Sequence, residues 1–237
     1  MKRKTQTTIR KIHRYFGIFI GIQFLFWTIS GLYFSWTDID EIHGDHFKNM
    51  EYKAPEYQNL IGLEQLKETS GIRSIDLRTI DHKPYYWINN EQLYSAIDGS
   101  PKEFINEEEA LSIAKERMQP HLEVASIELI HTTDAHHEYR ERRLPAYVIS
   151  YNNDEMLKAY VSKKDGAFQT VRHRAWRWFD FLWMTHTMDY QTRDDFNTLL
   201  LRSFSLLGLL TVLSGFTLWF ATSVRWRKFT SLFKSKS

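Results

Sequence analysis

The stretch KIHRYFGIFIGIQFLFWTISGLYFSW, from Lys11 to Trp36, carries no charged residue after Arg14. A helix needs about 20 apolar residues to cross the roughly 30 Å hydrocarbon core of a bilayer, and this run is long enough. A secretory signal peptide has a shorter apolar core and a small-residue cleavage site, whereas this run ends on aromatic residues. The stretch therefore predicts a membrane span over residues 15–36, with His13 at its start and SGLYFSW at its end.

A second apolar run covers residues 203–224 and contains LSGFTLWF, from Leu213 to Phe220. Lysine and arginine crowd the segments outside the two runs, residues 1–14 and 225–237. By the positive-inside rule both basic tails are cytoplasmic, so the segment between the spans lies on the opposite side. The sequence thus predicts a protein of the bacterial inner membrane, with the lipid bilayer as its first partner and a periplasmic central domain.

The composition excludes several classes of function. The chain has 237 residues, a formal net charge of +2 and no cysteine. Disulfides, thiol catalysis, iron–sulfur clusters and cysteine zinc sites are therefore excluded. The sequence also lacks the phosphate-binding glycine loop, the HExxH zinc motif and the G-x-S-x-G elbow. We expect no nucleic acid partner and no nucleotide, since the basic tails are too short to hold a nicotinamide nucleotide.

The segment between the spans contains an internal repeat. NNEQLYSAIDGSPK starts at Asn89 and NNDEMLKAYVSKKDGAFQ starts at Asn152, and each combines an Asn-Asn turn, an alternating strand and an Asp-Gly pair. A helix is expected before each copy, over Gly62–Thr69 and over Asn106–Met118, the second capped by Asn106. Strands are expected near residues 72–80, 85–88, 124–132 and 146–151.

These elements predict an α+β domain over residues 37–174, built from two α-β-β-β halves at about 62–99 and 107–166. Each half forms an antiparallel sheet whose apolar face a helix covers. The segment 175–190 follows this domain, and its residues Trp176, Phe179, Trp183 and His186 recur at helical spacing. We expect an interfacial aromatic helix there, before the second span.

The order of these motifs resembles the PepSY-associated transmembrane family. SKKDGAFQTVRH, then an aromatic segment with a histidine, then a helix with SGFTLW are similar to that family, and IHRYFGIFIG…SGLYFSW is similar to its first helix. The resemblance implies a periplasmic PepSY-like domain held by membrane helices. Larger members have four or more spans, and some are associated with haem and with reduction of ferric siderophores. With only two spans, this chain departs from a complete reductase core.

His13 and His186 are the sharpest candidate site residues, because the resemblance places the family's histidines at these two positions. A neutral imidazole can ligate haem iron, so both are candidate ligands of haem b. In the alternative interpretation they are structural, and the aromatic rings near them form a belt at head-group level. A span separates the two by roughly 30 Å, so one monomer cannot hold one haem between them. A homodimer or a membrane partner subunit is therefore expected.

Two further clusters suggest metal binding less specifically. His131, His136 and His137 lie in a polar loop with Asp134 and Glu138, and imidazole with carboxylate suits zinc, copper or iron. Their spacing matches no defined site, and such a loop needs no metal. DIDEIHGDH, residues 38–46, can likewise collect cations or serve as a solvated linker.

Two functions remain open at this point. The first is a haem- or partner-dependent redox component in iron or siderophore uptake, which would make the chain part of an iron(III)-siderophore reductase. The second is a non-catalytic periplasmic module that binds a peptide or a protein, such as a peptidase, through an exposed sheet edge. Only the first function requires His13 and His186.

Overall fold

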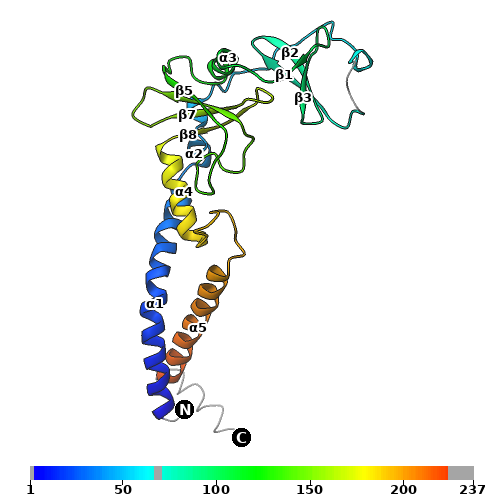
Figure 1. Cartoon of the computed structure of the whole chain (residues 1–237). Coiled ribbons are helices and arrows are strands. Elements are labelled where there is room, and N and C mark those ends of the chain that lie inside the picture. The colour runs from blue at the N-terminus through cyan, green and yellow to red at the C-terminus, as the bar shows by residue number, and fades with distance from the viewer. Residues whose placement is uncertain (1–2, 67–70, 224–237) are drawn as a thin grey trace. The chain divides into compact units, whose positions relative to one another are not determined.

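The computed structural model describes residues 3–66 and 71–223, drawn in colour in Figure 1. The chain divides into two compact units. The helical unit comprises the chain up to Trp36 and from Phe181 onward, and the central unit comprises Thr37–Asp180.

Two long apolar helices dominate the helical unit. α1 (Arg3–Trp36) contains the segment Thr7–Trp36, and α5 is Leu199–Thr222; each is long and apolar enough to cross a membrane. The predicted span 15–36 lies inside the longer α1. The predicted span 203–224 begins later than α5 does, because Thr198 caps the helix by accepting a hydrogen bond from the Leu201 amide at 3.2 Å.

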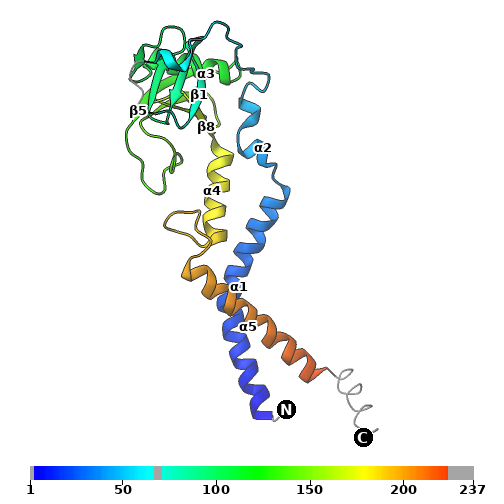
Figure 2. The ribbon, with the colours of Figure 1, turned by 90° about the vertical axis from the view of Figure 1, so that its right-hand side faces the viewer.

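α5 packs against α1, and Figure 2 shows that the two helices cross. Two glycines of α5 lie directly against side chains of α1. A Cβ atom at Gly208 would lie 3.3 Å from the Phe24 ring, and one at Gly215 would lie 3.2 Å from the His13 ring. Small residues at these positions let a ring of α1 rest directly on the backbone of α5.

α4 (Arg174–Thr187) ends three residues before the predicted interfacial helix 175–190 does. Met188 has a left-handed φ of 54°, which stops the helix. The buried Asp189 carboxylate then accepts hydrogen bonds from the backbone amides of Gln191, Thr192 and Asp195 and so fixes the loop that leads to α5.

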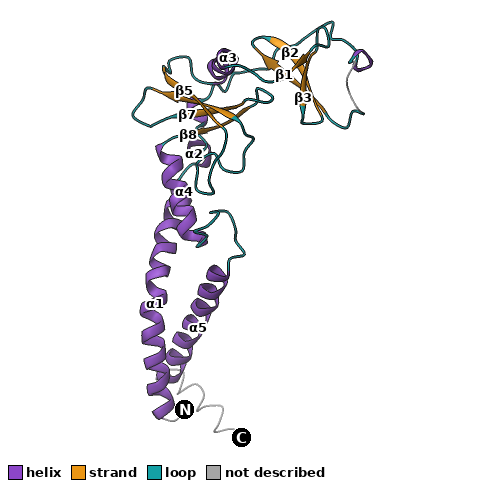
Figure 3. Cartoon of the chain, viewed as in Figure 1, coloured by secondary structure: helices purple, strands orange, loops and turns teal. Residues whose placement is uncertain are grey.

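The central unit contains two antiparallel sheets, shown as orange arrows in Figure 3. The strands of the first are β1 (Ile75–Ile80), β2 (Lys83–Ile88), β3 (Gln92–Ser95) and β4 (Pro101–Lys102). The strands of the second are β5 (Val124–Ile130), β6 (Ala146–Tyr151), β7 (Lys158–Ser162) and β8 (Phe168–Arg172). The predicted α+β class with antiparallel sheets is confirmed, although each sheet has four strands where the repeat predicted three.

The two halves differ in their helices. α3 (Glu107–Arg117) precedes the second sheet, and Asn106 caps it in a reciprocal capping box with Glu109, as its sequence predicted. The helix predicted over Gly62–Thr69 is wrong where the structure describes it. Only η2 (Leu63–Gln65) forms a single 3₁₀ turn there, because Leu66 is the one buried side chain and no apolar helical face exists. Residues 67–70 lie outside the described residues.

The turns of the repeat also differ. Asn89 and Asn90 have φ of 53° and 60°, the left-handed pair that a tight hairpin between β2 and β3 requires. Asn152 and Asn153 do not adopt it, because the loop between β6 and β7 is longer and Met156 supplies the left-handed residue, with φ of 50°. Gly166, in the second Asp-Gly pair, has φ of 64° as the turn between β7 and β8 demands.

α3 contacts both sheets and joins them through one core. Its buried side chains Ala110, Ile113 and Ala114 belong to this core together with Trp87 of β2. The opposite face of the second sheet is covered by the loop 131–145, where Tyr139 stacks on Tyr160 with ring centroids 4.5 Å apart. The long loop is therefore a packed part of the domain.

Candidate functional site

His13 contacts the second apolar helix. It lies in α1, and its Nδ1 atom is 2.8 Å from the hydroxyl oxygen of Ser214 in α5. The imidazole edge rests on Gly215, which has no side chain to exclude it. Ser214 and Gly215 of the second apolar run thus hold His13, the histidine that precedes the first apolar run.

His186 makes the corresponding contact with a serine of the first apolar helix. It lies near the end of α4, and its Nδ1 atom is 2.7 Å from the hydroxyl oxygen of Ser30 in α1. Ser30 is buried, and the indole of Trp27 donates a 2.8 Å hydrogen bond to the His186 carbonyl. The Phe34 ring packs edge-on against the imidazole. Burial lowers the pKa of His186, which favours its neutral form.

The serine hydroxyls determine which imidazole nitrogen carries the proton. Ser214 donates its proton to the Thr211 carbonyl at 2.7 Å, and Ser30 donates to a carbonyl one turn earlier in α1 at 2.7 Å. When each serine proton goes to that carbonyl, the serine oxygen accepts from its histidine, and the tautomer that fits this arrangement carries its proton on Nδ1. In both residues Nε2 keeps its lone pair and has no hydrogen-bond partner among the described residues.

This arrangement is the one that metal-ligating histidines use. Such a histidine donates its other ring N–H to an oxygen, which fixes the tautomer and the orientation of the ring. His13 and Ser30 mark the two contact levels on α1 and are about 25 Å apart at a helical rise of about 1.5 Å per residue. The two histidines therefore form two separate sites within the helical unit.

An open, largely apolar groove of about 660 Å³ lies beside His13. Phe24, Thr211, Phe216 and Trp219 line it with the imidazole. Its volume falls in the range of roughly 300–1,000 Å³ that cofactor and small-molecule sites occupy. An apolar groove with one nitrogen ligand at its edge suits a flat, apolar ring system.

The loop histidines are arranged differently. His131 and His136 are exposed, and Nδ1 of His137 accepts a 3.0 Å hydrogen bond from the Tyr139 amide. Throughout residues 3–66 and 71–223, no three His, Asp or Glu side chains are grouped to hold a metal ion. Glu138 instead accepts hydrogen bonds from Arg177 at 2.6 Å and from Tyr160 at 2.6 Å, which ties the loop to α4 and β7.

The acidic segment 38–46 also makes structural contacts. Asp38 caps the short helix α2 (Ile39–Ile42) by accepting a hydrogen bond from the Asp40 amide at 2.9 Å. Asp45 begins η1 (Asp45–Phe47) and pairs with Lys48 at 2.6 Å. These carboxylates therefore have partners within the chain.

Sequence reasoning identified both histidines but not their serine partners. The available signal was the Ser-Gly pair that occurs in each apolar run, at Ser30-Gly31 and Ser214-Gly215. No family model, no curated protein and no solved structure matches this chain.

Proposed function

We propose that the chain is a protein of the bacterial inner membrane that binds haem b through Nε2 of His13 and of His186 and acts as a redox component in iron or siderophore uptake. The observation that carries the proposal is the matched pair of Nδ1–serine contacts, at 2.8 and 2.7 Å. Each contact leaves Nε2 as the free ligand atom. The termini are cytoplasmic and the central unit is periplasmic in this proposal, since lysine and arginine flank the spans at the chain ends.

The chain's own residues have defined tasks in this function. Haem, when bound, supplies one-electron transfer, and the substrate is ferric iron carried by a siderophore. His13 and His186 ligate, while Ser214 and Ser30 fix the ring orientation and raise ligand basicity. The groove beside His13 excludes water from one side of the ring system. A further ligand to the haem would come from a second copy of the chain or from a partner subunit.

Visible spectroscopy of the detergent-purified full chain, reconstituted with haem, tests the proposal. Wild type should show a Soret band, and His13→Ala and His186→Ala should each remove one component of it. His131→Ala is the matched control and should leave the band intact. Ser214→Ala should weaken haem binding by about 10- to 100-fold without abolishing it, as loss of an outer-shell partner does. Wild type without a Soret band would end the haem proposal.

A second candidate function rests on an exposed edge strand. β1 pairs only with β2, so its other edge is free of a neighbouring strand in the described sheet. Its side chains Ile75 and Leu77 are 39% and 46% exposed. An extended peptide can add to such an edge and cover these side chains. If the Soret band is absent, peptide binding that a Leu77→Lys variant abolishes would favour the periplasmic module that docks a protein such as a peptidase.

A further inference from the structure

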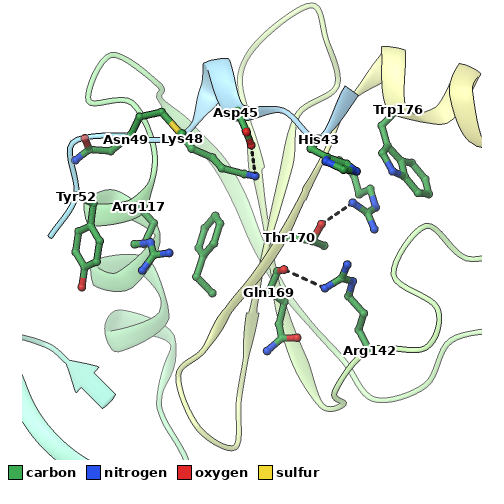
Figure 4. A pocket seen from close by; sticks show the side chains of 13 residues that line it. His43, Asp45, Lys48, Asn49, Tyr52, Arg117, Arg142, Gln169, Thr170 and Trp176 are labelled. Atoms are coloured by element: carbon green, nitrogen blue, oxygen red, sulfur yellow. Dashed lines mark hydrogen bonds and ion pairs between the residues drawn. The ribbon is translucent and has the colours of Figure 1, made fainter. Parts of the chain in front are cut away.

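Besides the groove beside His13 in the helical unit, the protein has a cavity in its central unit. The chemistry of this cavity is unrelated to that of the sites at His13 and His186. The cavity has a volume of about 540 Å³ and lies entirely within residues 43–176. Four cationic side chains line it, Lys48, Arg117, Arg142 and Arg172. Figure 4 shows Lys48, Arg117 and Arg142 around the opening, each contributed by a different segment of the chain.

The lining of this pocket carries more positive than negative charge. Asp45 is the one acidic residue in its lining, and Lys48 already pairs with it at 2.6 Å. No carboxylate of the described residues lies within 4.0 Å of Arg117, Arg142 or Arg172. Three guanidinium groups therefore line one cavity without a carboxylate in ion-pair contact, although the charge of Glu138, which pairs with Arg177, also acts on Arg172.

Three other arginines of the same unit are paired, and the exposed Arg73 and Arg174 lie outside the pocket. Arg140 contacts Asp180 at 2.7 Å, Arg143 contacts Asp165 at 2.5 Å, and Arg177 contacts Glu138 at 2.6 Å. Clustering of unpaired cations is thus a property of the pocket and not of the domain. An uncompensated buried charge is destabilising, and an anion from outside the chain would remove that penalty.

Arg172 is the clearest member of the group because it is 8% exposed. Its Nε donates to the Glu138 carbonyl at 2.8 Å, and its Nη1 donates to Thr170 and to the Val171 carbonyl. Its Nη2 has no hydrogen-bond partner in the described part of the chain, so two donors remain available. Burial and the positive charge of Arg142 lower the pKa of Arg172 to about 10, still far above neutral pH.

Aromatic rings hold two of the guanidinium planes in place. Arg172 lies 3.9 Å from the Trp176 ring centroid, and Arg117 lies 4.4 Å from the Tyr52 centroid. Stacking occupies the face of a guanidinium and leaves its N–H edge free for a coplanar oxyanion. Ordering these side chains in advance reduces the entropy lost when a ligand binds.

We propose that this pocket binds a small organic polyanion through Arg117, Arg142 and Arg172, with at least two carboxylate or phosphate groups on the ligand. Two or more oxyanions match three guanidiniums better than one does, and the volume suits a small molecule. The ligand is either a soluble metabolite or a lipid head group of the same chemistry. The inference does not depend on haem binding.

Calorimetry of the full chain in nanodiscs of zwitterionic lipid tests the proposal, with citrate and pyrophosphate as probes. Wild type should bind at least one probe at one saturable site. Arg172→Gln, Arg142→Gln and Arg117→Gln should each weaken binding by about ten- to a hundredfold, the loss expected for one charge-assisted hydrogen bond. Arg73→Gln removes the same charge from an exposed side chain outside the pocket and should bind like wild type.

The remaining arms separate the two sources of ligand and the possible artefacts. If cardiolipin, whose head group carries two phosphates, abolishes binding of the soluble probe when it is placed in the disc, the natural ligand is a head group; if affinity is unchanged, it is a soluble molecule. Arg142 is exposed, so Arg142→Gln tests the pocket even if Arg172→Gln fails to fold. The proposal is overturned if neither probe binds, or if all three pocket variants bind like Arg73→Gln.

Discussion

The hydroxyl oxygen of Ser30 lies 2.7 Å from Nδ1 of His186, and Ser214 stands in the same relation to His13 at 2.8 Å. Each apolar run thus supplies the serine that orients the histidine preceding the other run. The two contacts join α1 to α4 at one level and to α5 at another. This reciprocity explains why a histidine stands before each run and a Ser-Gly pair lies within it.

The Ser30–His186 contact should be measurable as a coupling energy. Ser30→Ala leaves Nδ1 of a half-buried imidazole without its acceptor and should lower the free energy of unfolding. A double-mutant cycle of Ser30→Ala and His186→Ala in detergent should give a coupling of about 0.6–1.7 kcal/mol, the range of hydrogen bonds between membrane helices. Ser35→Ala is the control, because Ser35 bonds only within α1. A coupling indistinguishable from zero would contradict the contact.

Gly166 should be a stability determinant of the central unit. Its φ is 64°, and a Cβ atom there would lie 3.0 Å from Ile80 and 3.2 Å from Ile113. Gly166→Ala combines left-handed strain of about 1–2 kcal/mol with an overpacking penalty of about 1–3 kcal/mol. Gly71→Ala has left-handed strain alone, since no atom lies near its Cβ position. Thermal unfolding should rank wild type above Gly71→Ala and Gly71→Ala above Gly166→Ala; equal effects would refute the contact with Ile80.

The ion pair of Glu138 should make stability depend on pH. Burial by itself would raise the pKa of Glu138, but hydrogen bonds from Arg177 and Tyr160 and the charges of Arg177 and Lys158 outweigh it and lower the pKa below 4.5. A carboxyl group whose pKa is lower in the folded state than in the unfolded state stabilises the fold at pH values above its unfolded-state pKa. This stabilisation is lost as the pH falls through the folded-state pKa.

Glu138→Gln tests this linkage. The variant should be less stable at neutral pH by about 1–3 kcal/mol, and its stability should fall less than that of wild type on acidification below 4.5. Glu141→Gln changes an exposed carboxylate in the same loop and should titrate like wild type. Near-ultraviolet circular dichroism of the full chain during thermal unfolding, repeated across the acidic range, gives both quantities. Parallel pH profiles for wild type and Glu138→Gln would contradict the assigned role.

Local signals in the sequence predicted much of the fold. The uncharged runs predicted both long helices, and Asn106 with Glu109 marked the start of α3, because capping depends on neighbours within one turn. The helix expected at Gly62–Thr69 is wrong over its described residues 62–66, among which Leu66 is the one buried side chain. The short strand β4 was missed because a two-residue strand has no measurable alternation.

Only the histidines of the candidate site could be predicted from the sequence, because local signals do not reveal partners that are distant in the chain. A histidine beside an apolar run is visible in the sequence, but its partner is set by tertiary packing: His186 and Ser30 are 156 residues apart. The cationic pocket was invisible because Arg117 ends α3, Arg142 lies in a loop and Arg172 ends β8. Only the packed domain brings these three segments to one cavity.

Membrane topology is the last prediction, and the absence of native cysteine makes it directly testable. Single cysteines can be placed by Lys164→Cys, at an exposed position in the turn between β7 and β8, and by Ser237→Cys at the chain end. Because lysine and arginine are concentrated on the chain-end sides of the two spans, a membrane-impermeant maleimide should label the first site in cells with a permeabilised outer membrane. The second site should react only after the inner membrane is broken. Wild type, which has no thiol, gives the background signal. Labelling of Ser237→Cys in intact spheroplasts, or protection of Lys164→Cys there, would contradict the predicted two-span topology. The central unit could then no longer meet a periplasmic iron carrier.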